Sequence, residues 1–106
     1  MTSRAYEVSS GNVFADLGLA RPQDLLAKAE LAVKVIQEIR RRRLTQSEAA
    51  ALLGVDQPKI SALKQGKLSG FSIERLLRFL LLLGQDVEIT IHSKPRSRPV
   101  AKLHVA

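Results

Sequence analysis

The chain has 106 residues, 17 basic against 10 acidic side chains, a formal net charge of +7 and a sequence pI near 10.4. This length suits one domain with a modest core, which must be mainly aliphatic because aromatic residues make up only 4% of the sequence. The absence of cysteine excludes disulfides and thiolate metal sites. The charge favours a polyanionic partner, and with no apolar leader and no apolar run of membrane-spanning length we expect a cytoplasmic protein without membrane contact.

The N-terminal region divides into two short stretches before the first long helix. Residues 1–11 are polar and are expected to be a flexible lead. Residues 12–19, NVFADLGL, predict a single helical turn that Asn12 caps and Gly18 ends. Pro22 then suits the first turn of a helix of about 20 residues, whose apolar positions recur at spacings of three and four. These positions are Leu25, Ala29, Ala32, Ile36 and Ile39, with Leu26 and Val33 beside them.

Consecutive arginines at positions 40–43 end this helix. Successive residues of a helix lie about 100° apart, so the side chains fan around the axis and do not form one patch. Cations at a helix C-terminus are favourable in themselves because they complement the helix dipole. Arg43 is in addition a candidate for contact with a phosphate group.

The stretch LTQSEAAALLGVDQPKISALKQGK, residues 44–67, predicts two short helices joined by a sharp corner. Thr45 and Glu48 have the spacing of a capping box, which begins the first helix. Gly54 allows the left-handed backbone in which helices commonly end, and Asp56 can cap the second helix. This arrangement is a helix–turn–helix. Small or apolar residues occupy the positions where its helices meet: Ala49, Ala50, Leu53, Val55, Ile60 and Leu63.

A further helix and a change of pattern follow. Ser72 can cap a helix that ends at Gly84, with an apolar side made by Ile73, Leu76, Leu77, Leu80 and Leu81. Residues 85–94, QDVEITIHSK, then alternate apolar and polar residues, which is typical of a strand with one buried face. The apolar members of this strand are Val87, Ile89 and Ile91.

A lone strand leaves its backbone groups unpaired on both edges. Two partners inside the chain are conceivable, residues 4–8 and residues 100–105. The alternative, which we favour, is the same strand of a second copy, paired antiparallel across a two-fold axis. Residues 93–106 are basic and contain proline, so a flexible tail is expected.

In a helix–turn–helix, the N-terminal side chains of the second helix lie at base edges in the DNA major groove. Gln57 can pair with adenine, Lys59 can donate to guanine, and Ala62 can touch a thymine methyl group. Pro58 is tolerated in the first helical turn, where it fixes the backbone but offers no hydrogen bond. The expected base-reading residues are Asp56, Gln57, Pro58, Lys59 and Ala62. The expected phosphate contacts are Gln46, Ser61, Lys64, Lys67 and Arg43.

These residues resemble a known family. Residues 44–67 are similar to the helix–turn–helix of the phage-repressor-like (xenobiotic-response-element, XRE) family, and the matching positions are Gln46, Ala50, Gly54, Val55, Ile60 and Leu63. Over about residues 12–91 the chain looks like a compact subgroup similar to antitoxins of host-inhibition-of-growth type. The resemblance implies five helices, binding to the protein's own operator and, in many members, a small ribonuclease toxin as partner. Pro58 departs from the family pattern, since several members carry a polar base-reading residue there.

The predicted architecture is therefore mainly α: a helix–turn–helix domain over residues 12–92, with one C-terminal strand that pairs across a dimer. The expected function is sequence-specific binding of double-stranded DNA at a palindromic operator, as a homodimeric repressor associated with the nucleoid and as the antitoxin of a toxin–antitoxin pair. Two alternatives stay open. One is an antitoxin that neutralises a ribonuclease toxin by protein contact alone, and the other is RNA binding, although few aromatic residues are available for stacking.

An enzyme is not expected. His92 and His104 lie near the C-terminus without cysteine or clustered carboxylates at the spacing of metal ligands. There is no Ser–His–Asp arrangement and no glycine-rich phosphate loop. We therefore predict no catalytic residue, no cofactor and no bound metal.

Overall fold

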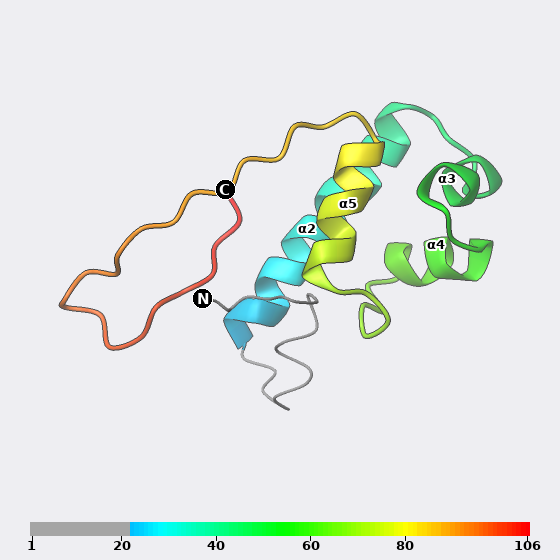
Figure 1. The fold of residues 1–106 in the computed structure, drawn as a ribbon. Helices are drawn as coiled ribbons and strands as arrows, with labels where there is room; N and C mark the ends of the chain where they lie inside the picture. The colour runs from blue at the N-terminus through cyan, green and yellow to red at the C-terminus, as the bar shows by residue number, and fades with distance from the viewer. Residues whose placement is uncertain (1–21) are drawn as a thin grey trace.

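A computed structural model describes residues 22–106 of the chain (Figure 1). This part contains the helices α2 (Pro22–Arg41), α3 (Gln46–Leu53), α4 (Gln57–Lys64) and α5 (Ile73–Leu82). Helices α2 and α5 run alongside each other, while α3 and α4 pack together against one side of that pair (Figure 1). The mainly helical fold is confirmed. The lead of residues 1–11 and the helical turn over residues 12–19 lie outside the described residues, so the fifth helix stays a prediction.

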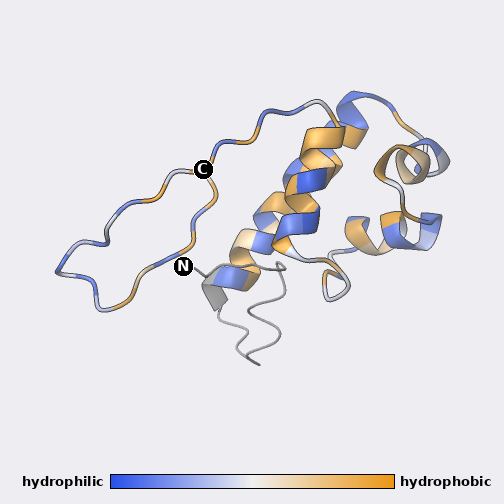
Figure 2. Ribbon diagram, in the orientation of Figure 1, coloured by the Kyte–Doolittle hydropathy of each residue, from blue (hydrophilic) through white to orange (hydrophobic). Residues whose placement is uncertain are grey.

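The core lies where the four described helices meet. Its largest fully buried side chains are Val35, Ile39, Ile60, Leu76, Phe79 and Leu83, which come from α2, α4, α5 and the residue after α5. Figure 2 shows hydrophobic and hydrophilic residues alternating along α2 and α5, as expected for helices with one buried side. Among the described residues, all the buried apolar side chains except Phe71 and Phe79 are aliphatic, as the composition requires. No helix within residues 22–106 has both the length and the apolar character needed to span a bilayer.

The buried side of α2 agrees in part with the predicted one, since Ala32, Ile36 and Ile39 are buried and Ala29 is half-buried. Leu31, Val35 and Ile39 are buried together with Ala27, Ala32 and Ile36, whereas Leu25, Leu26 and Val33 are exposed. Apolar residues occupy a wide part of the α2 surface. The neighbouring helices α5 and α4 contact only a portion of it. The helix therefore buries two neighbouring i, i+4 rows that face those helices and leaves the apolar residues of its other side exposed.

Side-chain caps begin the helices where the sequence predicts them. The Glu48 backbone N–H donates to Thr45 Oγ1 at 3.0 Å, and the Thr45 N–H donates to Glu48 Oε1 at 2.8 Å, which completes the capping box of α3. At the start of α5, the Arg75 N–H donates to Ser72 Oγ at 3.1 Å. These bonds satisfy amide groups that have no acceptor inside the helix.

The strand predicted over residues 85–94 is not formed within the single chain. Beyond α5 the backbone leaves the helices in extended form and then turns back, and no strand is assigned between residues 85 and 106 (Figure 1). Val87 packs partly on the core, whereas Ile89 is 72% exposed and Ile91 is 90% exposed. A strand exists only when a second backbone completes its hydrogen-bond ladder, so the alternating pattern alone could not produce one here.

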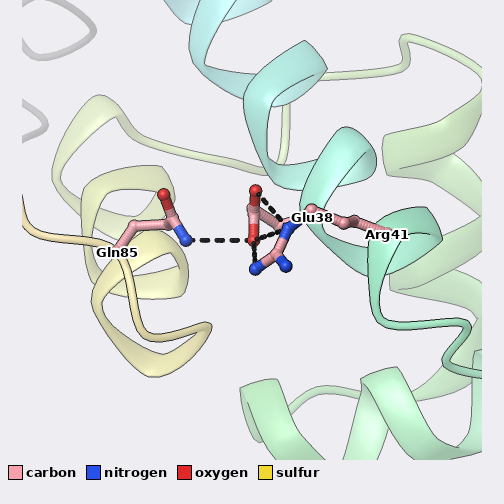
Figure 3. Close-up of polar contacts among 3 residues, drawn as sticks. All are labelled: Glu38, Arg41 and Gln85. Atoms are coloured by element: carbon pink, nitrogen blue, oxygen red, sulfur yellow. Dashed lines mark hydrogen bonds and ion pairs between the residues drawn. The ribbon is translucent and has the colours of Figure 1, made fainter.

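The start of this extended segment is fixed to the helices by a polar contact. Glu38 of α2 lies between Arg41 and Gln85 (Figure 3). The Gln85 Nε2 atom donates to Glu38 Oε1 at 3.0 Å, and Arg41 Nη2 donates to the same oxygen at 2.7 Å. The end of α5 is thus attached to the last turns of α2, which sets the direction in which residues 86–92 leave the domain.

Candidate nucleic-acid interface

The corner between α3 and α4 has the geometry that the sequence predicts. Gly54 adopts a left-handed conformation with φ 72° and ψ 33°, and the Val55 N–H donates to the Ala50 carbonyl oxygen at 3.0 Å across the turn. Ala49 and Ala50 are buried where α3 approaches the rest of the domain. The small side chains permit this close approach, so α4 is held at a fixed angle to α3 with its first turn outward.

The first turn of α4 is capped and exposed. Asp56 Oδ1 accepts the backbone N–H of Lys59 at 3.0 Å, and Pro58 lies in the first turn, where its missing N–H is not needed. Asp56, Gln57 and Pro58 are all exposed, and the N-terminal end of α4 is hydrophilic in Figure 2. Three of the five predicted base-reading residues therefore lie together on an accessible surface.

The other two predicted base-reading residues are less accessible. Ala62 is half-buried and packs partly on the core. Lys59 is also half-buried, and its Nζ lies 5.4 Å from the centroid of the Phe71 ring. Its ammonium group is thus directed at the loop between α4 and α5, although its backbone belongs to the first turn of α4.

Four of the predicted phosphate contacts come from α3, α4 and the loop after α4. Lys64 and Lys67 are exposed at the end of α4 and just after it, and Gln46 is half-buried as the first residue of α3. Ser61 is half-buried, and its Oγ accepts a hydrogen bond from Gln65 Nε2 at 3.4 Å. Gln46 thus begins the helix before α4, Ser61 and Lys64 lie on α4 itself, and Lys67 lies in the loop after it.

Arg43 ends α2 in an unusual conformation. Its φ of 56° is in the left-handed region, and it is the only non-glycine residue with positive φ among the described residues. The Leu44 N–H donates to the Ile39 carbonyl oxygen at 3.1 Å across it, as in a Schellman motif. In the described chain the other left-handed residues are glycines, Gly54, Gly66 and Gly84. Arg43 thus holds an exposed guanidinium at a position where glycine is less strained.

The arginines of residues 40–43 have different surroundings. Arg41 is paired with Glu38, and the hydrogen bond from Arg41, helped by the charges of Arg41 and Arg42, lowers the pKa of Glu38 from its ordinary value of 4.5. The same hydrogen bond raises the pKa of Arg41. Arg42 lies against Gly84, where an added Cβ would meet its Nη2. All four arginines are exposed, and their different contacts direct Arg41 to α2 and Arg42 to the end of α5.

The sequence did not indicate the aromatic group beneath this surface. Phe71 is only 3% exposed, and its ring lies 6.1 Å, centroid to centroid, from that of Phe79 in an edge-to-face arrangement. Arg75 Cζ lies 5.8 Å from both ring centroids. The loop before Phe71 is held by Lys28, whose Nζ donates to the Leu68 carbonyl oxygen at 3.3 Å. Spacing alone could not reveal these contacts, since they join α2, α4 and α5.

The fold and the exposed first turn of α4 define a helix–turn–helix protein. The model of the family described as "Helix-turn-helix domain" matches residues 13–92, and the chain belongs to this family. A solved structure named "Putative XRE Family Transcriptional Regulator" is 50% identical, with a TM-score of 0.73 over 79% of this chain and 94% of that chain. No curated protein matches. The resemblance to XRE-type helix–turn–helix proteins is confirmed, while the antitoxin subgroup stays a prediction.

Proposed function

We propose that this protein binds double-stranded DNA sequence-specifically and regulates transcription from a palindromic operator. Helix α4 enters the major groove, where Gln57 reads a base edge beside Pro58 and Asp56. Gln46, Arg43, Lys64 and Lys67 contact phosphates on either side and set the docking angle. The name of the 50% identical structure supports regulation of transcription.

One observation carries this proposal: the capped first turn of α4 carries the exposed side chains of Asp56, Gln57 and Pro58 directly after the corner at Gly54. The buried Ala50 and the left-handed Gly54 hold the turn away from the core. The net charge of +7 supplies the sequence-independent attraction to phosphates that such docking requires. Gln57 is the amide side chain in this turn, and amides pair bidentately with adenine.

The test begins with a site selected from a randomised duplex pool, followed by fluorescence anisotropy with the selected and a random duplex. Gln57→Ala should weaken binding to the selected site by about 5- to 150-fold, equivalent to about 1–3 kcal/mol, and relax preference at one base pair. Gln37→Ala, an exposed glutamine on α2, is the matched control and should change neither. RNA that competes as well as the selected duplex would overturn the proposal.

The regulator acts as a homodimer in this proposal. Residues 86–92 pair antiparallel with the same residues of a second copy, which completes the backbone ladder and covers Ile89 and Ile91. Leu81 and Leu82, both exposed at the end of α5, extend the apolar surface next to this segment. A two-fold dimer places its reading helices about 34 Å apart, or one turn of DNA, on a palindromic site.

Sedimentation equilibrium tests the dimer directly. Ile89→Asp should shift the protein to monomer and strongly weaken operator binding, because one half-site alone binds poorly. Thr90→Asp, which places the same charge on the opposite face of the strand, is the matched control and should remain dimeric. A wild-type protein that is monomeric at concentrations where it fills the full operator would contradict the dimer.

Repression and an antitoxin role complete the proposal. A dimer bound over a promoter excludes polymerase, so a reporter under the selected operator should be silenced by the wild type and released by Gln57→Ala.

The antitoxin role rests on the resemblance over about residues 12–91. It is tested by co-expression with the neighbouring gene, whose product should be a small basic ribonuclease that co-purifies with this chain. Co-purification with no operator binding would favour the alternative in which the protein acts by protein contact alone.

A further inference from the structure

We propose that Lys59 and Arg75 form a phosphate-binding pair held over Phe71, and that Lys59 contacts the DNA backbone and not a base. The inference rests on the proposed function and assigns Lys59 a role different from the base contact that its sequence position suggests. Phe71 and Gly70 are positioning residues in this arrangement, since they act on DNA only through the Lys59 side chain.

The first argument is the direction of the Lys59 side chain. Its Nζ lies 5.4 Å from the Phe71 centroid, and a Cβ added at Gly70 would be 2.8 Å from the same atom. The ammonium group is therefore at the loop between α4 and α5, beside the exposed turn that carries Gln57. Because a ring attracts a cation and Gly70 leaves space for it, this position of the flexible lysine is favoured. A contact with a base edge would require the ammonium group to leave the ring.

The second argument is the accumulation of positive charge there. Arg75 Cζ lies within 5.8 Å of the Phe71 centroid, so two cations share one buried ring. Within residues 22–106 neither cation forms an ion pair with a carboxylate. Both residues are half-buried. An anion with several oxygens placed beside this ring would attract both cations, and the duplex offers a phosphate on each strand beside the groove that α4 enters.

The third argument concerns rigidity. Phe71 is itself fixed by its edge-to-face contact with Phe79, and the loop is held by the hydrogen bond from Lys28 to the Leu68 carbonyl oxygen. The cation pair is thus connected to α2 and α5, not to α4 alone. A phosphate bound there would fix the angle at which α4 enters the groove, and so act on every sequence alike.

The experiment measures binding to the selected and the random duplex between 50 and 200 mM salt. Lys59→Ala should weaken binding to both duplexes by the same factor and leave the order of base preference unchanged. The slope of log K against log salt concentration should decrease in magnitude by about 0.9. The factor by which affinity drops between the two salt concentrations should therefore be about 3.5-fold smaller than for the wild type. Arg75→Ala should act in the same way. Lys34→Ala, an exposed lysine on α2, is the matched control and should leave the slope unchanged.

Gly70→Ala tests the positioning without opening the core. The new methyl group meets only the flexible end of Lys59, so the fold should be kept while the ammonium group is displaced. Gly70→Ala should weaken binding to both duplexes, and it should have no further effect in a Lys59→Ala background. Wild-type affinity for Gly70→Ala, or an equal loss in both backgrounds, would overturn the positioning role.

The failure of this inference can be distinguished from failure of the proposed function. If Lys59→Ala alters preference at a base pair and leaves the salt slope unchanged, Lys59 reads a base and the inference is wrong. The proposed function then still stands, provided that Gln57→Ala relaxes specificity. If the wild type selects no duplex from the randomised pool, the proposed function itself fails.

Discussion

The corner at Gly54 offers the sharpest test of how the fold presents α4. In Gly54→Ala the new Cβ would meet no atom within 4 Å, so the cost comes from the backbone alone. An L-residue at φ 72° and ψ 33° costs about 1–2 kcal/mol, while alanine stabilises the folded state by about 0.4–1 kcal/mol through a less flexible unfolded chain. The net expectation is a loss of about 1 kcal/mol in the free energy of unfolding.

Urea and thermal unfolding followed by circular dichroism measure this loss. A change of about 1 kcal/mol should lower Tm by about 4–8 °C in a domain of this size. Gly54→Asn should lose less, because asparagine tolerates the left-handed region.

Gly70→Ala is the matched control for the same substitution where φ is not positive, and it should be no less stable than the wild type, because alanine has the same effect on the unfolded chain without the left-handed strain. If Gly54→Ala proved no less stable than Gly70→Ala, backbone conformation would not be what fixes the corner.

Three further predictions concern packing, backbone strain and pH. Ala50→Leu should lower the free energy of unfolding by about 1–3 kcal/mol in urea titrations, because α3 has no room for a larger side chain where Ala50 is 5% exposed. Arg43→Gly should raise stability by about 1 kcal/mol by releasing its left-handed strain, and it should also lower the salt slope of DNA binding by about one unit if Arg43 contacts a phosphate. Glu38 has a lowered pKa in the folded state, so its contribution to stability is present at neutral pH and is lost as the pH falls below 4.5 and through the folded value. The stability difference between wild type and Glu38→Gln should therefore shrink between pH 7 and pH 3, and a difference that grows on acidification would contradict this.

Much of the candidate site could be predicted because its signals are local. The capping box of Thr45, the cap of Asp56 and the turn at Gly54 each depend on residues within about four positions of one another. Such contacts form wherever the chain adopts the helix, so their sequence patterns are reliable guides. The exposure of Gln57 and Pro58 followed from these signals once the corner was placed.

Other features could not be predicted because they depend on residues distant in sequence. The exposed Leu25 and Leu26 fit the helical period as well as the buried Leu31 does, and only the position of α5 separates them. The direction of Lys59 depends on Phe71, which belongs to a different segment. The alternation of residues 86–92 indicates β-structure, but a ladder needs a second backbone that the single chain does not supply.

The sequence by itself determined the helices, their caps and the corner that makes a helix–turn–helix, since each is set by backbone conformation and hydrogen bonds between near neighbours. The tertiary structure alone decided which side of α2 is buried and where the Lys59 ammonium lies. The physical reason is that packing and cation–ring contacts join residues that are distant in the sequence. Such residues become neighbours only when the chain has folded.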